Sequence, residues 1–175
     1  MTFPFLGMHA SAFVFEDAGA CDALAGRFML MSAPGRQAGF YPIRGGRVAT
    51  FFAHRMPEAR LPASPVQALE QHYGHLGWLI PTALRQARQL SNIYYDSVSQ
   101  VRLTRWSFGR IALVGDACQA VSLVAGQGAS LAMNAAHVLS EELLNAHSSI
   151  EEALARYETR LRPLIERKQR QVARP

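Results

Sequence analysis

A change of sequence pattern near Gly109 constrains the fold of this chain more than any other feature. Before it, short runs rich in β-branched and aromatic residues alternate with Gly- and Pro-bearing turns, which is typical of antiparallel strands. After it, the continuous apolar run at 111–114 is typical of a strand covered on both faces, as in a parallel sheet. The sequence therefore predicts an α+β or α/β protein with two domains, over residues 1–105 and 106–175.

The first domain is expected to be a meandering antiparallel sheet with short helices at about 64–89. Gly45-Gly46, between two apolar runs, is the clearest hairpin signal. Ser64-Pro65 is a helix N-cap followed by proline at the first helical position, and Pro81 opens a second short helix. The expected strands cover 5–16, 27–33, 39–43, 47–55 and 92–105.

The second domain is expected to contain one strand and two helices. The first helix begins after Gly126-Gln127-Gly128 and has apolar residues at helical spacing. Ser148-Ser149, followed by two glutamates, marks the start of the second helix, which we expect to run to about Gln171.

Composition excludes several classes of protein. An apolar content of 49% in 175 residues rules out a disordered chain and is enough for a real core. Two cysteines, Cys21 and Cys118, cannot form a disulfide framework, which favours a reducing compartment. The N-terminal residues lack signal-peptide features, and no apolar run is long enough to span a membrane. We therefore expect a cytoplasmic protein without a membrane partner.

The net charge of +5 is concentrated in the C-terminal segment, where arginines crowd a predicted helix. A surface that binds nucleic acid usually interleaves aromatic residues and glycines with its cations, and here Tyr157 is the only aromatic residue in that segment. The pattern favours a solvated helix face with a basic end, and no nucleic-acid partner is expected.

One motif has the composition of a site for an anionic ligand. A strand ends at Gly115-Asp116, a loop of small residues follows, and Gly126-Gln127-Gly128 begins a helix. Glycines let the backbone approach a ligand closely, and the free amides at a helix start favour negative charge. Asp116, at the carboxyl end of the strand, is suited to accept hydrogen bonds from sugar hydroxyls. Taken alone, the pattern is equally typical of a plain strand–turn–helix connection.

The longer string GRIALVGDACQAVSLVAGQGASLAMNAAHVLSEEL resembles the second FAD-binding motif of the flavoprotein aromatic hydroxylases, the p-hydroxybenzoate hydroxylase-like FAD-dependent monooxygenases. The spacing between its two glycine motifs matches this family without a gap. YYDSVSQVRLTRWSFGR resembles the strand and turn that lead into that motif, and GFYPIRGGRVATFF resembles the substrate-domain sheet. The resemblance covers nearly the whole chain.

The resemblance implies a function and a set of cofactor-binding residues. Asp116 would hydrogen-bond the ribityl or ribose part of FAD, while Gly126, Gln127 and Gly128 would lie beside the flavin ring. In such enzymes NADH or NADPH reduces the flavin, which then uses oxygen to hydroxylate an aromatic or polyketide-like small molecule. The predicted cofactor-binding residues are Gly115, Asp116, Gly126, Gln127, Gly128, Ala129 and Ser130.

Three positions differ from the family pattern. Gln119 stands where the family usually has His, Leu123 where it has Pro, and Ser130 where it often has Asn. Gln119 can still form hydrogen bonds. The change at Leu123 replaces a rigid residue and bears on hydroxylation more than on flavin binding.

The chain also lacks a strand–GxGxxG–helix unit and the central Asp-Gly motif, which hold the FAD pyrophosphate in full-length members. It therefore resembles only their C-terminal half, and we expect FAD binding to be weak or absent and the fragment to be inactive alone. An apolar surface should remain, covered by self-association or by a missing N-terminal half. The alternative is a non-catalytic remnant or binding module that lends the substrate sheet to a partner chain.

Other candidate residues favour structural interpretations. His72 and His75 lie three apart on a predicted helix without a third metal ligand, so no metal site is expected. Cys118 lies near the flavin motif, but a buried small side chain is the better interpretation. No serine has the context of a nucleophile elbow, which argues against a hydrolase. Four apolar residues fit either a substrate pocket or the sheet core: Met29, Met31, Phe51 and Phe52.

Overall fold

The computed structural model describes residues 1–146 and 149–172, so the predicted helix start at Ser148 lies outside the described residues. The chain divides into two compact units. We call Gly7–Ser97 the sheet unit, and Met1–Leu6 with the chain from Val98 onward the helical unit.

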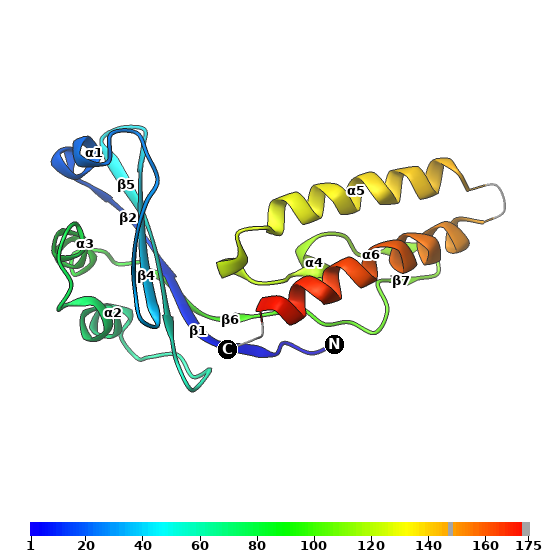
Figure 1. Cartoon of the computed structure of the whole chain (residues 1–175), viewed down its shortest axis with the longest axis horizontal. Helices are drawn as coiled ribbons and strands as arrows, with labels where there is room; N and C mark the ends of the chain where they lie inside the picture. Colours follow the sequence, from blue (N-terminus) through cyan, green and yellow to red (C-terminus); the bar gives the residue numbers. More distant parts are fainter. Residues whose placement is uncertain (147–148, 173–175) are drawn as a thin grey trace. The chain divides into compact units, whose positions relative to one another are not determined.

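The expected antiparallel sheet is present and has six strands (Figure 1). Their order is β3-β4-β5-β1-β6, with β2 also pairing with β5, and the β1–β5, β2–β5, β3–β4 and β4–β5 pairs are antiparallel. The strands are β1 (Phe5–Ala12), β2 (Val14–Glu16), β3 (Met29–Ala33), β4 (Arg36–Ile43), β5 (Arg47–Arg55) and β6 (Tyr94–Ser99).

Two details of these strands can be compared with the expectations. The hairpin at Gly45-Gly46 is confirmed: Ile43 pairs with Arg47, and both glycines have positive φ, +80° and +66°. The run expected over 5–16 is instead split at Phe13. The Phe13 carbonyl accepts from the Thr50 amide at 2.9 Å and from the Thr50 hydroxyl at 3.0 Å. The Phe13 amide donates to that hydroxyl at 3.1 Å, so a side chain takes part in the pairing there.

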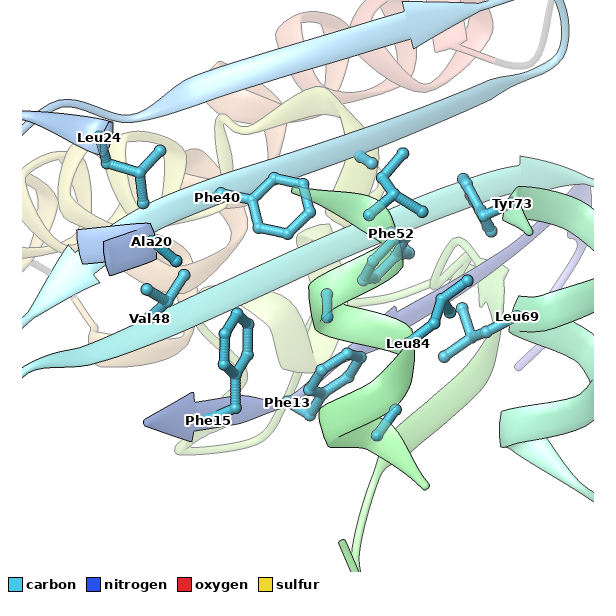
Figure 2. Close-up of a cluster of buried hydrophobic side chains, with 14 residues drawn as sticks. Phe13, Phe15, Ala20, Leu24, Phe40, Val48, Phe52, Leu69, Tyr73 and Leu84 are labelled. Atoms are coloured by element: carbon cyan, nitrogen blue, oxygen red, sulfur yellow. The ribbon is translucent and has the colours of Figure 1, made fainter. Parts of the chain in front are cut away.

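Three helices belong to the sheet unit. The two expected helices are α2 (Pro65–Tyr73), capped by the Ser64 side chain, and α3 (Ile80–Ala87). The third helix, α1 (Ala18–Leu24), was not predicted; its N-cap Asp17 accepts a hydrogen bond from the Ala20 amide at 2.8 Å. Helix and strand side chains meet in one buried cluster on one face of the sheet (Figure 2). We call this the helix-covered face, and the opposite one the open face.

The strand expected over 92–105 is shorter than predicted, because β6 ends at Ser99. At the next residue, the fully buried Gln100 side chain donates a hydrogen bond to the Gln169 carbonyl at 2.8 Å. The chain thus leaves the sheet and joins the helical unit, where Arg102 forms an isolated antiparallel bridge with Thr2. The strand therefore ends because residues 100–102 form hydrogen bonds within the helical unit and not with the sheet, although residues 100–105 favour β-structure.

The expectation of a strand over 111–114 covered on both faces was wrong. The structure has a short antiparallel pair, β7 (Ser107–Phe108) and β8 (Ile111–Ala112), in which Phe108 is 76% and Ile111 71% exposed. Among the residues the structure describes, β7 alone pairs with β8, so no parallel neighbour covers it. The exposed side chains form the kind of apolar surface that the absence of neighbouring strands predicts.

The rest of the helical unit consists of helices. Short segments, α4 (Asp116–Gln119) and a 3₁₀ turn (Leu123–Ala125), occupy the expected loop and precede α5 (Gly128–Leu144) and α6 (Ile150–Val172). Helices α5 and α6 lie side by side and antiparallel (Figure 1). Arg156 and Arg160 on α6 pair with Glu142 and Glu141 on α5 at 2.9 and 2.8 Å, so these tail cations are partly neutralised. None of the helices in the described residues is long and apolar enough to cross a membrane.

Candidate functional site

The predicted glycine motif begins at a buried glycine that no other residue can replace without strain. Gly115 has φ +67°, and a Cβ built on it would lie 3.3 Å from the Ala132 Cβ on α5. The positive φ disfavours side-chain-bearing residues, and the close approach adds a steric penalty. Gly115 therefore allows the turn after β8 to pack directly against α5.

The structure brings the two ends of the motif together. A Cβ at Gly128 would lie 3.6 Å from Oδ1 of Asp116, so the carboxylate lies beside the first residue of α5. The Asp116 side chain is exposed, and Gly126, with φ +63°, ends the 3₁₀ turn between them. A carboxylate acceptor and the start of a helix thus occupy one place on the helical unit.

The N-terminus of α5 carries amides that precede the first helical hydrogen bond. That bond runs from the Leu131 amide to the Gln127 carbonyl at 3.0 Å, and the Gln127 side chain does not cap the helix. Ser130 donates its hydroxyl to the Gln127 carbonyl at 3.0 Å, so this hydroxyl is used within the helix. Because α5 is 17 residues long and has no acidic residue in its first turn, its amide end favours a negative group.

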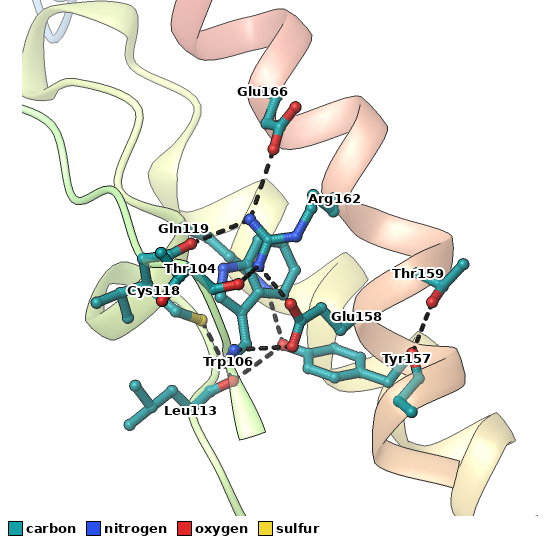
Figure 3. A network of polar contacts seen from close by, with 12 residues as sticks. Thr104, Trp106, Leu113, Cys118, Gln119, Tyr157, Glu158, Thr159, Arg162 and Glu166 are labelled. Carbon is teal, nitrogen blue, oxygen red and sulfur yellow. Dashed lines mark hydrogen bonds and ion pairs between the residues drawn. The ribbon is translucent and has the colours of Figure 1, made fainter. Parts of the chain in front are cut away.

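Gln119 and Cys118 point away from this exposed surface. Gln119 is buried, and its Nε2 donates to the Tyr157 hydroxyl at 2.6 Å, which in turn donates to the Leu113 carbonyl at 3.1 Å (Figure 3). Cys118 donates its thiol to the same carbonyl at 3.2 Å, and burial raises the pKa of this thiol to about 11. The thiol therefore stays protonated, as the interpretation of a buried small side chain requires.

A second network in the helical unit escaped sequence analysis because its members are far apart in the chain. The Arg162 guanidinium lies 4.8 Å above the Trp106 ring and donates to the carbonyls of Leu103 and Thr104 at 3.0 and 3.1 Å (Figure 3). It also pairs with Glu158, which accepts a hydrogen bond from the Trp106 amide at 2.8 Å. Arg162 thus fastens the loop before β7 to α6.

The four apolar residues considered for a substrate pocket separate by face. Met31 and Phe52 pack in or against the core on the helix-covered face, and Met29 pairs with the buried Phe40 of that face. Phe51 pairs with Gly39 and projects from the open face, because side chains alternate along a strand.

The open face carries an apolar patch built around Gly39. A Cβ on Gly39 would lie 2.8 Å from the Phe28 ring, so this ring rests directly on the strand. The Phe28 ring centroid lies 6.1 Å from that of Tyr41, and both rings are exposed, as is Leu30. We call Phe28, Leu30, Tyr41 and Phe51 the open-face patch.

The helix-covered face holds a buried polar cluster that sequence analysis also missed. His54 on β5 lies between two tyrosine hydroxyls, with Nδ1 3.3 Å from Tyr73 and Nε2 2.9 Å from Tyr95. The only sequence signal was the period-2 alternation that placed His54 on the same face as Phe52. Within the described residues, no group of three His, Cys, Asp or Glu side chains is arranged to hold a metal ion.

Comparisons with known proteins agree on one family. Residues 62–172 match the family model described as FAD binding domain. A flavin-dependent monooxygenase of Legionella longbeachae is 32% identical over 117 residues, which is 67% of this chain and 30% of that protein. The FAD-dependent monooxygenase asL6 of Sarocladium schorii is 37% identical over 99 residues, 57% of this chain and 23% of that protein.

Solved structures extend the likeness to nearly the whole chain. The tetracycline destructase Tet(55) superimposes with a TM-score of 0.81 at 27% identity, covering 98% of this chain and 46% of that one. Klebsiella pneumoniae HpxO, complexed with FAD and uric acid, shares the fold with a TM-score of 0.75 at 22% identity, over 98% of this chain and 45% of that one. The chain thus spans under half the length of the proteins it matches. It belongs to the FAD-binding domain family and corresponds to part of a p-hydroxybenzoate hydroxylase-like FAD-dependent monooxygenase.

Proposed function

We propose that this chain supplies the flavin-ring side and the substrate-contacting sheet of an FAD-dependent monooxygenase that hydroxylates an aromatic or polyketide-like small molecule. The observation that carries the proposal is the juxtaposition of the Asp116 carboxylate with the first residue of α5, Gly128. A plain strand–turn–helix connection needs neither an exposed carboxylate there nor glycines at both ends of the turn.

The residues present fit one part of FAD and leave another part unheld. Glycines at 126 and 128 leave room for a flat ring to approach the backbone, and the α5 amides suit its polar edge. Asp116 accepts hydrogen bonds from hydroxyls of the ribityl chain or ribose. The diphosphate would be held by a strand–GxGxxG–helix unit, which these 175 residues do not contain. We therefore expect weak FAD affinity for this chain by itself.

The substrate-contacting surface is assigned to the open-face patch. Monomeric proteins rarely leave several large apolar side chains together in water, and such a patch is usually a binding surface. The Phe28 and Tyr41 rings offer flat apolar contacts suited to an aromatic ligand. On this proposal Gly39 acts indirectly, because a Cβ at this position would lie 2.8 Å from the Phe28 ring and would push the ring away from β4.

The residues of this chain contribute position and electrostatics to the proposed reaction. FAD, when bound, would supply the redox chemistry, with NADH or NADPH as the transient source of electrons. The α5 amides and helix dipole stabilise negative charge beside residues 126–128, and Asp116 fixes the sugar chain in one orientation. Buried Gly115 and Gln119 hold the turn in place from beneath.

Titration with FAD tests the proposal directly. We expect quenching of flavin fluorescence on binding, and an affinity about tenfold lower in Asp116→Asn, because a hydrogen bond to a charged group is lost. Asp22→Asn, on exposed α1, is the matched control and should bind FAD like the unchanged chain. Equal affinity of all three proteins, or no binding even when a polypeptide with the GxGxxG half is co-expressed, would contradict the proposal.

The alternative of a non-catalytic binding module has its own support. Phe108, Ile111, Met133 and Leu144 remain exposed on the helical unit, as expected of a surface that another chain or a second copy covers. In the titration, a colourless protein that stays colourless with excess FAD, yet associates with a partner chain, would favour this alternative.

A further inference from the structure

The buried cluster around His54 borders a pocket that the proposed flavin and substrate surfaces do not use. The pocket lies on the sheet unit between the segment after β5 and helix α2, and its volume is about 540 Å³. This size falls within the usual range for small-molecule sites, about 300–1,000 Å³. Its walls include the apolar side chains of Met56, Leu61, Pro62 and Ala68 and three polar residues, Gln71, His72 and Tyr95. Two charged residues, Glu58 and Arg60, also line it.

The direction of the hydrogen bonds behind this pocket can be assigned from the acceptor at one end. The Gln37 carbonyl can only act as an acceptor, and it accepts a hydrogen bond from the Tyr73 hydroxyl at 3.2 Å. The Tyr73 oxygen therefore accepts from His54 Nδ1–H, and His54 Nε2 is left as an acceptor for the Tyr95 hydroxyl at 2.9 Å. Tyr95 thus donates its only hydroxyl proton in the hydrogen bond to His54.

This assignment requires a neutral His54, and its surroundings keep it so. Burial, with smaller contributions from His72, His9 and Arg36, lowers the pKa of His54 to about 3. The His72 ring stacks on the His54 ring with centroids 4.0 Å apart, and Arg36 donates to the His72 carbonyl, which holds the end of α2 against the cluster. The hydrogen-bond direction is therefore stable at neutral pH.

We propose that this pocket is a second small-molecule site, specific for a small aromatic compound that carries a hydroxyl or amino donor. With its proton directed to His54, the Tyr95 oxygen offers only lone pairs, so a ligand must donate to it. The apolar walls accept a planar ring, and His72 adds an aromatic surface at the same end. An apolar molecule without a donor gains only the ring contact.

The test consists of two separate titrations of the ¹⁵N-labelled full chain, one with phenol and one with toluene, which is the matched probe without a donor. The amide chemical shifts are followed in both titrations. We expect saturable shifts at residues 63, 71, 72 and 95, with toluene binding about three- to tenfold more weakly than phenol. Tyr95→Phe should abolish this difference between the probes. Tyr94→Phe, the neighbouring residue on the other face of β6, should preserve it, and Ala63→Leu, in the pocket wall, should weaken both probes.

Three results would overturn the inference: equal affinity of phenol and toluene for the unchanged chain, shifts confined to the open-face patch, or no saturation. The probe comparison on the unchanged chain remains decisive if Tyr95→Phe fails to fold. Because no flavin takes part in the titration, its outcome is independent of the outcome of the FAD titration.

Discussion

The sheet unit and the helical unit each bury an apolar cluster, but they differ in its size and in the polar contacts that accompany it. In the sheet unit, aromatic rings fill the space between strands and helices, and the Phe52 centroid lies 5.7 Å from that of Phe13 and 4.8 Å from that of Tyr73. In the helical unit, Arg162 and Tyr157 tie backbone carbonyls of distant loops to α6. The sheet unit buries the larger apolar cluster, whereas in the helical unit these polar ties add to a smaller cluster that includes Trp106, Tyr157 and Leu161.

This difference follows from the neighbours that each unit has within the chain. The sheet has α1, α2 and α3 to cover one of its faces, so it can bury a continuous apolar cluster. Strand β8 finds only β7 among the described residues, and Ile111 stays exposed. Within the described residues, helices therefore cover one face of the sheet, whereas the short β7–β8 pair leaves apolar side chains exposed.

The largest expected effect is in the sheet core. Phe52→Ala should lower the free energy of unfolding by about 3–5 kcal/mol, because a fully buried ring leaves a cavity among three aromatic neighbours. Phe51→Ala, on the open face, should cost less than about 1 kcal/mol. Urea denaturation followed by circular dichroism measures both, and equal losses would refute the assignment of the two faces.

Acid should affect the sheet unit first. Above about pH 6.5 His54 is neutral in both the folded and the unfolded state, so it adds no pH dependence to the free energy of unfolding. Below that pH only the unfolded chain binds a proton at His54, because the pKa of His54 in the folded chain is about 3. Stability should fall by about 1.4 kcal/mol per pH unit, or about 3 kcal/mol by pH 4.

Hydrogen exchange as a function of pH checks this difference between the units. In the helical unit His137 is exposed and lies 3.5 Å from Glu141, so it does not belong to a buried cluster of this kind. Faster exchange in both units at the same pH, or an unchanged slope in His54→Gln, would show that His54 is not the acid-sensitive group.

Removal of the polar ties should destabilise the helical unit. Arg162→Ala removes the cation that pairs with Glu158 and lies above the Trp106 ring, and it leaves two loop carbonyls without their donor. We expect this to cost about 2–3 kcal/mol. Arg167→Ala, an exposed position on the same helix, should change stability by less than about 0.5 kcal/mol. A similar loss in both variants, measured by thermal unfolding, would mean that helix charge rather than the network is responsible.

The smallest effect concerns the turn after β8. Gly115→Ala should cost about 1–2 kcal/mol, since it combines a positive φ with a 3.3 Å approach to Ala132. Gly26→Ala, with φ +73° but open space around its Cβ, isolates the conformational cost and should lose about 1 kcal/mol. If the two variants lose the same amount in urea denaturation, the close packing of the turn on α5 contributes nothing.

Local sequence signals predicted those elements whose stability is local. Gly45-Gly46 permits positive φ whatever the surrounding structure. At the start of α2, the Ser64 side chain accepts a hydrogen bond from a free helix amide and Pro65 fixes a helical φ. Both signals act locally, so both elements were identified correctly. The glycine motif and the resemblance likewise identified the family, while the cofactor-binding roles of Asp116 and residues 126–130 stay a prediction. The missed helix α1 had one such signal, the N-cap Asp17, but too short an apolar pattern to be recognised.

The sequence by itself determined the antiparallel sheet, the hairpin, the long helices and the family, because each depends on residues close together in the chain. Tertiary structure decided where β6 ends, that β8 is exposed, and which of the adjacent residues Phe51 and Phe52 is buried. It also assembled the His54 and Arg162 clusters. Their members are separated by tens of residues, and only packing of distant segments brings hydrogen-bonding groups within reach of one another.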